Sequence, residues 1–185
     1  GHKADELMAL LQDLLALPDA KVVVFSQWLR MHALIVRRLT GTGWGHVLFH
    51  GSVPGEQRGA LIERFIDDPQ CRLFLSTDAG GVGLNLQHAA AVVVNMDLPW
   101  NPAVLEQRIG RVFRLGQTRG VQVFNFVAEG TIEEGMLQVL AFKKSIFAGV
   151  FDGGASDIFM QGTRLAKFME SVDQVAQAAQ EVRTQ

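Results

Sequence analysis

The sequence predicts an α/β protein in which helices cover both faces of a parallel β-sheet. Short runs of consecutive apolar residues, rich in valine, leucine and phenylalanine, recur along the chain, as expected of strands that are buried on both faces. These runs alternate with segments of helical periodicity, a pattern that favours parallel strands joined by right-handed crossovers. The chain has 185 residues, 48% of them hydrophobic, which is enough for one well-buried domain.

The expected elements follow in the order helix, strand, helix, strand, helix, strand, strand, helix, strand. The first helix carries leucines at helical spacing from Leu7 to Leu15 and is expected to end near Pro18, because proline disfavours a helical residue before it. The expected strands cover residues 22–25, 47–49, 73–75, 91–94 and 121–127. The helices between them are expected at 28–39, around 61–66 and at about 102–111.

The last third of the chain is expected to be helical. A long helix is predicted at 132–150, ended by the glycines that follow Asp152, and an amphipathic helix at 163–183. We therefore divide the chain into a leading helix at 1–19, a main domain at 20–152 and a helical extension at 153–185. The chain begins with Gly1-His2, which we interpret as a tag remnant ahead of a segment of a longer protein.

Charge and cysteine content exclude several classes of protein. The net charge is −2, so any attraction to nucleic acid must come from a local arrangement, such as the four arginines between Glu106 and Glu129, a window without acidic residues. The single cysteine, Cys71, excludes a disulfide framework and a cysteine-rich zinc site, and is expected in the core. With no apolar run long enough for a bilayer and no signal-peptide pattern, we expect an intracellular protein without membrane contact.

The segment 107–117 is the most informative run. Gln107, Arg111 and Arg114 are spaced i, i+4 and i+7, so on a helix they share one face, with Ile109 and Val112 on the packing side. Such a face suits a triphosphate, because arginine stays ionised and grips phosphate oxygens in a bidentate way. A solvated basic helix remains the alternative at this point.

Polar residues follow four of the predicted strands and are expected at one edge of the sheet, where ligands of parallel α/β sheets bind. These segments are Ser26-Gln27, His50-Gly51-Ser52, Ser76-Thr77-Asp78 and Asn95-Met96-Asp97. The hydroxyls of Ser76 and Thr77 suit a nucleic-acid backbone, and Asp78 with the glycines after it suits a nucleotide. A tight strand-to-helix turn is the alternative for that loop. For Arg58, an internal ion pair is as good an explanation as a phosphate contact.

Several catalytic patterns are missing from the sequence. There is no Gly-x-x-x-x-Gly-Lys-Ser/Thr phosphate loop, and no acidic pair ends a strand, so the chain is not expected to hold ATP and magnesium alone. The histidines lack metal-ligand spacing, and no Gly-x-Ser-x-Gly occurs. We therefore expect no metal site and no self-contained acid–base enzyme.

Several ordered blocks within residues 20 to 150 resemble a known family. They are Val24-Phe25-Ser26-Gln27, Gly51-Ser52 through Arg58, Ser76 through Leu86, Asp97 through Pro102, Gln107 through Gln117 and Thr131-Ile132-Glu133-Glu134. Together they resemble the C-terminal RecA-like lobe of helicase superfamily two, in particular the Swi/Snf-type ATP-dependent DNA translocases. The resemblance implies a RecA-like, three-layer α/β fold over 20–152.

The resemblance also implies roles for individual residues. Arg111 and Arg114, with Gln107 beside them, would reach ATP held by a preceding lobe. The nucleotide would be bordered by Asp78, Gly81 and Gly83. The phosphate backbone of one DNA strand would be followed by Ser26, Gln27, Gly51, Ser52, Arg58, Ser76 and Thr77.

The implied function is that of the second motor lobe of a translocase or remodeller acting on double-stranded DNA. ATP and Mg²⁺ would be bound mainly by the N-terminal lobe of the same parent protein, so the parent would be an ATP hydrolase and this chain alone inactive. Gly110 and Asp78 depart from many eukaryotic members of the family, which suggests a bacterial-style member. A non-catalytic module that binds nucleic acid or protein, and an RNA helicase lobe, are the alternatives.

Overall fold

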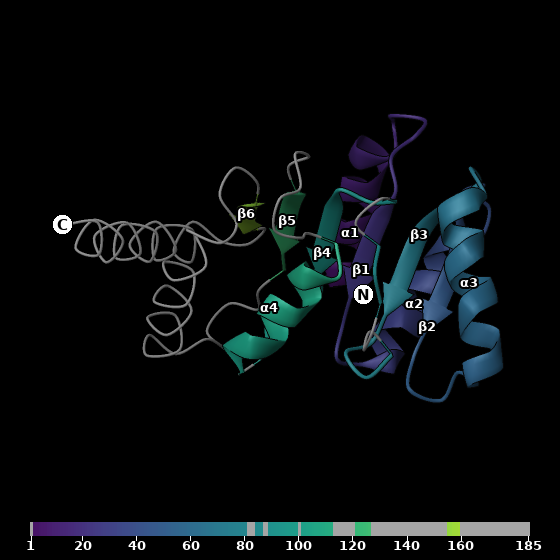
Figure 1. Cartoon of the computed structure of the whole chain (residues 1–185). Coiled ribbons are helices and arrows are strands. Elements are labelled where there is room, and N and C mark those ends of the chain that lie inside the picture. Colours follow the sequence, from purple (N-terminus) through teal and green to yellow (C-terminus); the bar gives the residue numbers. More distant parts are fainter. Residues whose placement is uncertain are drawn as a thin grey trace.

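The computed structural model describes residues 2–80, 84–86, 89–99, 101–112, 121–126 and 155–159. They contain one six-stranded sheet with the strand order β2-β3-β1-β4-β5-β6, and every neighbouring pair of strands is parallel (Figure 1). The strands are β1 (Val22–Phe25), β2 (Gly45–Phe49), β3 (Cys71–Ser76), β4 (Val92–Asn95), β5 (Val121–Asn125) and β6 (Ala155–Phe159). The predicted parallel α/β architecture is confirmed.

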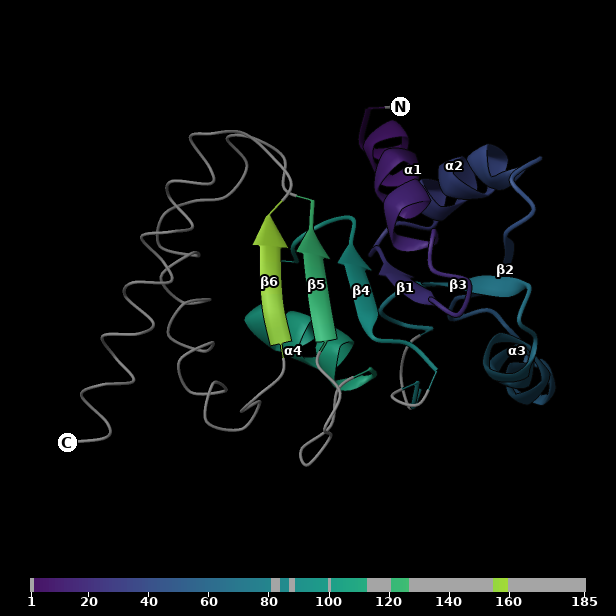
Figure 2. The ribbon, with the colours of Figure 1, turned by 90° about the horizontal axis from the view of Figure 1, so that it is seen from above.

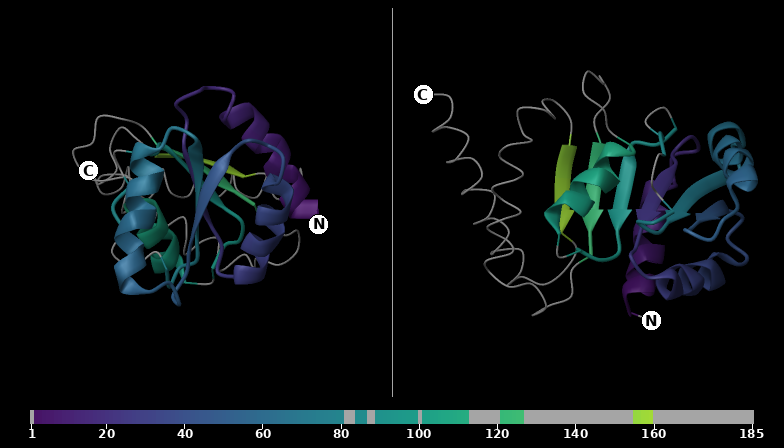
Figure 3. Two further views of the ribbon diagram at one scale, coloured as in Figure 1. Left: turned by 90° about the vertical axis from the view of Figure 1, so that its right-hand side faces the viewer. Right: turned by 60° about the horizontal axis from the view of Figure 1, so that its bottom comes forward.

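Helices lie on both faces of this sheet. They are α1 (His2–Leu14), α2 (Leu29–Leu39), α3 (Gly55–Asp67) and α4 (Pro102–Gly110). Seen from above, α1 and α2 lie on one side of the strands, while α3 and α4 lie on the other (Figure 2). The view along the sheet in Figure 3 shows the same three layers. The helices expected at 132–150 and 163–183 lie outside the described residues.

Two apolar cores, one on each face, hold the layers together. Beneath α3, the ring of Phe74 from β3 stacks against those of Phe49 and Phe65, with centroids 5.1 and 5.2 Å apart. On the opposite face, Leu7 of α1 and Ile35 of α2 are fully buried against the valines and leucines of β1 and β3. All four residues of β1 are buried, which explains why its sequence is a continuous apolar run.

Strand β6 was not expected from the sequence. Its residues Ala155–Phe159 pair in parallel with the whole of β5, so the edge of the sheet lies in the segment interpreted as a helical extension. Ser156 and Asp157 interrupt the apolar run, and two glycines precede it, so the local pattern resembles a helix break more than a strand. The division of the chain at residue 152 stays a prediction.

Long basic side chains connect the elements at the amino ends of the strands. Lys21, just before β1, donates to the carbonyls of Phe65, Asp68 and Cys71, at 2.7 Å for Asp68 and 2.8 Å for Cys71. These groups lie at the end of α3 and the start of β3. Cys71 itself is buried in the core as predicted, and burial raises the pKa of its thiol.

Candidate functional site

The carboxyl ends of the central strands bring polar groups from separate loops together. Strands β3, β1 and β4 are neighbours, so the loops that begin with Thr77, Ser26 and Met96 start side by side. Helix α4 adds side chains to this edge, because Gln107, Arg108 and the nearby Arg111 line a pocket together with Asp78. The site therefore combines four segments that are distant in the sequence.

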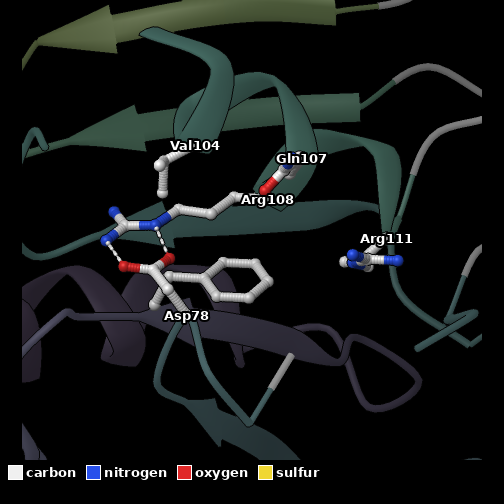
Figure 4. A pocket seen from close by; sticks show the side chains of 6 residues that line it. Asp78, Val104, Gln107, Arg108 and Arg111 are labelled. Carbon is white, nitrogen blue, oxygen red and sulfur yellow. Dashed lines mark hydrogen bonds and ion pairs between the residues drawn. The ribbon is translucent and has the colours of Figure 1, made fainter. Parts of the chain in front are cut away.

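Arg108 is the centre of this arrangement, and it is only 2% exposed. Its Nε and Nη2 donate to the two carboxylate oxygens of Asp78, at 2.6 and 2.8 Å, in a bidentate pair (Figure 4). Nη2 also donates to Asp97 Oδ1 at 2.9 Å, and Nη1 donates to the Asp97 carbonyl at 2.9 Å and to Asn95 Oδ1 at 3.3 Å. These five bonds match the five N–H donors of a guanidinium.

The charge of Arg108 is fixed by these partners. Burial alone lowers the pKa of Arg108, but the hydrogen bonds and negative charges of Asp78 and Asp97 outweigh it and raise the pKa overall. The guanidinium carbon also lies 5.8 Å from the centre of the Phe25 ring, at the end of β1. A permanent cation thus connects α4 to the ends of β3, β4 and β1.

Asp97 connects this cation to the loop after β1. Its Oδ2 accepts a 2.5 Å hydrogen bond from the hydroxyl of Ser26, and both carboxylate oxygens accept from the backbone N–H of Gln27, at 3.2 and 3.3 Å. The Ser26 oxygen in turn accepts from the N–H of Trp28 at 3.1 Å, just before α2 begins. One carboxylate therefore holds both the side chain of Arg108 and the Ser26–Trp28 loop.

A buried histidine lies under the same loops. The Nε2 of His32 lies 2.9 Å from the Ser76 carbonyl, and since a carbonyl only accepts, Nε2 carries the proton. Its Nδ1 is buried and has no hydrogen-bond partner among the described residues. Burial lowers the pKa of His32, which keeps the ring neutral and suits a supporting role in the fold.

The pocket beside Arg108 is small. It is lined by Phe25, Asp78, Val104, Gln107, Arg108 and Arg111 (Figure 4). Its volume of about 20 Å³ is enough for a water molecule and far too small to enclose a nucleotide. Gln107 and Arg111 accordingly lie at a surface hollow and not in a closed site.

A comparison with known proteins agrees with this geometry. Residues 2–116 match the model of the helicase conserved C-terminal domain. The chain belongs to this family. A solved structure of the C-terminal part of the Fun30 ATPase domain superposes on 98% of the chain and 54% of its own, with a TM-score of 0.66 and 22% identity. That likeness confirms the RecA-like fold implied by the resemblance.

Curated relatives of this helicase C-terminal domain come from plants, yeasts and bacteria. The DNA repair protein RAD5A of Arabidopsis thaliana is 36% identical over 150 residues, which are 80% of this chain and 14% of that protein. The chromatin-remodeling ATPase INO80 of Candida glabrata is 35% identical over 162 residues, 87% of this chain and 11% of its own. An uncharacterized ATP-dependent helicase of Bacillus subtilis, YqhH, is 36% identical over 138 residues, 75% of this chain and 24% of its own. The similarity to Swi/Snf-type ATPases is confirmed.

In this helicase lobe, the structure describes two residues of the predicted face, Gln107 and Arg111. Helix α4 ends at Gly110, and Arg111 lies in the following turn, where its carbonyl accepts a 2.7 Å bond from the N–H of Leu86. Val112 is fully buried, as expected of the packing side, and Arg114 lies outside the described residues.

The residues predicted to follow a DNA backbone fall into two groups in the lobe. Ser26 and Ser76 are fully buried and Thr77 is 8% exposed. The Ser76 hydroxyl donates to the Thr77 carbonyl at 2.8 Å, and the Thr77 hydroxyl accepts from the N–H of Gly80 at 3.1 Å. In contrast, Gln27, Gly51 and Ser52 are exposed. The buried hydroxyls therefore shape the loops in this conformation.

Arg58 makes an internal contact, but its partner is a backbone carbonyl. Its Nη2 donates to the carbonyl of Gly80 at 2.5 Å, and its guanidinium lies 4.7 Å from the centre of the Phe49 ring. A side chain at position 80 would meet Phe49 O and His50 Cα at 2.6 Å, so only glycine fits there. Gly81 and Gly83, the other predicted nucleotide neighbours, lie outside the described residues.

The pairing of Arg108 with Asp78 and Asp97 was not found from the sequence. Asp78 and Asp97 lie 30 and 11 positions before Arg108 in the sequence, and only the strand order shows that they meet it. An aspartate two residues after the end of each of two buried strands was the available signal. The described residues contain no group of three or more potential metal ligands, and none of the helices described is long and apolar enough to cross a membrane.

Proposed function

We propose that this helicase C-terminal domain is the second motor lobe of an ATP-dependent translocase or remodeller acting on double-stranded DNA. The chain spans 11 to 24% of the length of the curated relatives compared, so the remainder of such a protein would supply the first lobe. The observation that carries the proposal is the open hollow lined by Gln107, Arg111 and Asp78 at the carboxyl edge of the sheet. It presents the guanidinium of Arg111 for a triphosphate without enclosing one.

The nucleotide would be held by the preceding lobe, together with most of the Mg²⁺ coordination. Arg111, with Arg114, would approach the γ-phosphate as the two lobes close and stabilise the charge that develops during phosphoryl transfer. Gln107 lies beside Arg111 in the hollow, and Asp78, Gly81 and Gly83 would border the nucleotide. Arg108 contributes by fixing α4, since its five hydrogen bonds end on groups of β4 and of the loops after β3 and β4.

The DNA backbone would run along the exposed loops of the same edge. Gln27 and Ser52 are exposed there, and Arg58 is half-buried with its charge unpaired by any acid among the described residues. Trp28 is 51% exposed next to the guanidinium of Arg30, 5.4 Å from its ring, and adds an apolar and cationic surface beside Gln27. The buried Ser26, Ser76 and Thr77 would act by setting the loop shape.

The experiment is a comparison of ATP hydrolysis by the full-length protein with duplex DNA, single-stranded DNA and RNA. We expect the largest stimulation by duplex DNA. Stimulation by RNA alone would indicate an RNA helicase lobe. Nucleic-acid binding without any hydrolysis would indicate a non-catalytic module and would contradict the motor.

DNA binding by the isolated lobe gives a second test. We expect weak binding that weakens further with added salt along a shallow slope, because the few basic groups of this edge can displace only a few counterions. Arg30→Ala should reduce the slope of log Kd against log salt by about one phosphate contact. Arg37→Ala, an exposed arginine at the other end of α2, is the matched control and should leave the slope unchanged.

A further inference from the structure

We propose that Asp97 and Arg108 form a positioning unit that couples nucleotide binding at α4 to DNA binding at the Ser26–Trp28 loop. The proposal rests on the function proposed above and adds the residues through which the two ligands would influence each other. Neither residue would touch ATP or DNA. Their role follows from the groups they hold.

The nucleotide side of the unit is Arg108. It lies on α4 directly after Gln107 and three residues before Arg111, the two groups proposed to meet ATP. Because its guanidinium is buried and all five donors are bonded, a shift of α4 must move Arg108 against its partners or carry them along. A displacement of Arg111 by the nucleotide would therefore reach Asp97.

The DNA side of the unit is the loop after β1. The carboxylate of Asp97 holds this loop through the hydroxyl of Ser26 and the N–H of Gln27. Through the Ser26 oxygen it also holds the N–H of Trp28, the residue that precedes α2. Gln27 and Trp28 are both exposed, so a small movement of Asp97 would change how they face a DNA strand.

The alternative is that these bonds only stabilise the fold. A hydrogen-bonded route between two sites is a hypothesis until energetic coupling is measured, since spatial connection alone does not prove it. The measurement must therefore respond to coupling and not to the fraction of folded protein. The ratio of two dissociation constants for one protein sample has this property.

The experiment measures the Kd of duplex DNA for the full-length protein, with and without a non-hydrolysable ATP analogue. In the unaltered protein we expect the analogue to change this Kd by about fivefold or more, a usual size for coupling between two sites. Ser26→Ala, which removes the hydroxyl that links Asp97 to the N–H of Trp28, and Arg108→Lys, which removes the planar fork, should each bring the ratio closer to one. If Ser26 instead touched DNA directly, its loss would weaken both constants equally and leave the ratio unchanged.

The double variant tests whether the two residues act as one unit. If both work through Asp97, Ser26→Ala combined with Arg108→Lys should give the same ratio as the stronger single variant. If the two substitutions change the ratio independently, so that their effects multiply in the double variant, the proposal is overturned. Single variants that keep the ratio of the unaltered protein would also overturn it. Arg38→Lys, at the Arg38–Asp5 ion pair between α2 and α1, is the control and should keep the full ratio.

The result separates the two proposals. In one outcome, duplex DNA stimulates ATP hydrolysis by the full-length protein, but the analogue does not change its Kd for duplex DNA. This outcome would contradict the positioning unit and agree with the motor lobe. A protein without DNA-stimulated hydrolysis would contradict the motor lobe and the coupling together.

Discussion

The two edges of the sheet use the donors of basic side chains in different ways. At the amino edge, Lys21 donates to three backbone carbonyls, and Arg72 does the same with the carbonyls of Leu15, Leu17 and Ala20. At the carboxyl edge, Arg108 has two aspartate side chains and an asparagine side chain as partners in addition to one carbonyl. Basic side chains therefore donate to backbone carbonyls at the amino edge and mostly to side-chain oxygens at the carboxyl edge.

This difference indicates different tasks. Backbone carbonyls at the ends of α1, α3 and the start of β3 are positioned by the secondary structure itself, so the amino edge is tied into one arrangement. The carboxylates of Asp78 and Asp97 are carried by separate loops, and their bonds can be exchanged without unfolding an element. The amino edge would serve stability and the carboxyl edge would serve the motor.

The largest expected effect concerns Arg111, the half-buried cation at the carboxyl edge. Arg111→Ala in the full-length protein should lower DNA-stimulated ATP turnover by about a thousandfold, because an arginine that completes a phosphoryl-transfer site contributes about this much. Steady-state ATPase assays measure it, and Arg37→Ala on α2 is the control with normal turnover expected. Normal turnover in Arg111→Ala would exclude this arginine from the catalytic site.

Removal of the buried cation should cost the most stability. Arg108→Met leaves two aspartates facing each other without their partner, and breaking such a buried pair costs about 3 kcal/mol. Urea denaturation of the chain should show this as a lower midpoint. Because Asp78 and Asp97 keep 28% and 13% side-chain exposure, water can offset part of the loss.

A smaller effect is expected at the amino edge. Lys21→Met keeps the aliphatic stem but leaves three carbonyls without a donor, at a cost of about 1 to 2 kcal/mol in the free energy of unfolding. In the full-length protein, DNA-stimulated ATP turnover should stay normal at a temperature where the variant is folded. Lost turnover in the folded variant would mean that the two edges do not divide the tasks.

The smallest effect is a pH dependence from His32. Burial lowers its pKa below the ordinary histidine value of about 6.5, so the unfolded chain binds the proton first as pH falls. The stability that neutral His32 provides is therefore complete above pH 6.5 and is lost as pH falls toward the folded pKa. Between pH 7.5 and 5.5 the free energy of unfolding should fall by up to about 1 kcal/mol from this residue.

Denaturation of His32→Gln at both pH values isolates that contribution. The glutamine retains a donor for the Ser76 carbonyl and does not titrate, so its loss of stability between the two pH values should be smaller than that of the unaltered chain. His46→Gln is the matched comparison for this pH dependence, because burial also lowers the pKa of His46, which is only half-buried. Equal pH dependence in His32→Gln and the unaltered chain would contradict the buried neutral histidine.

The fold was largely predictable because most of its strands can be recognised from their own residues. Runs such as the valines of β1 and β4 are buried on both faces, so burial alone makes them recognisable. Strand β6 depends on pairing with β5 and not on its own pattern, and it escaped prediction. The end of α4 at Gly110, in contrast, agrees with the helix expected at about 102–111.

The site was only partly predictable for the same reason. The sequence brings out Gln107, Arg111 and Asp78, because their motifs are short and local. The partners of Arg108 become visible only when strand order places the ends of β3 and β4 beside β1. Burial likewise separates Ser26, which shapes its loop, from Gln27, which is exposed, although the two are adjacent in sequence.

The central claim is that this chain holds half of an ATP site. It is tested most directly by measuring ATP hydrolysis of the isolated chain and of the full-length protein in parallel, each with saturating duplex DNA. We expect no turnover above background from the isolated chain, and turnover from the full-length protein that depends on Arg111. Hydrolysis by the isolated chain, or full-length turnover that is indifferent to Arg111→Ala, would contradict the claim.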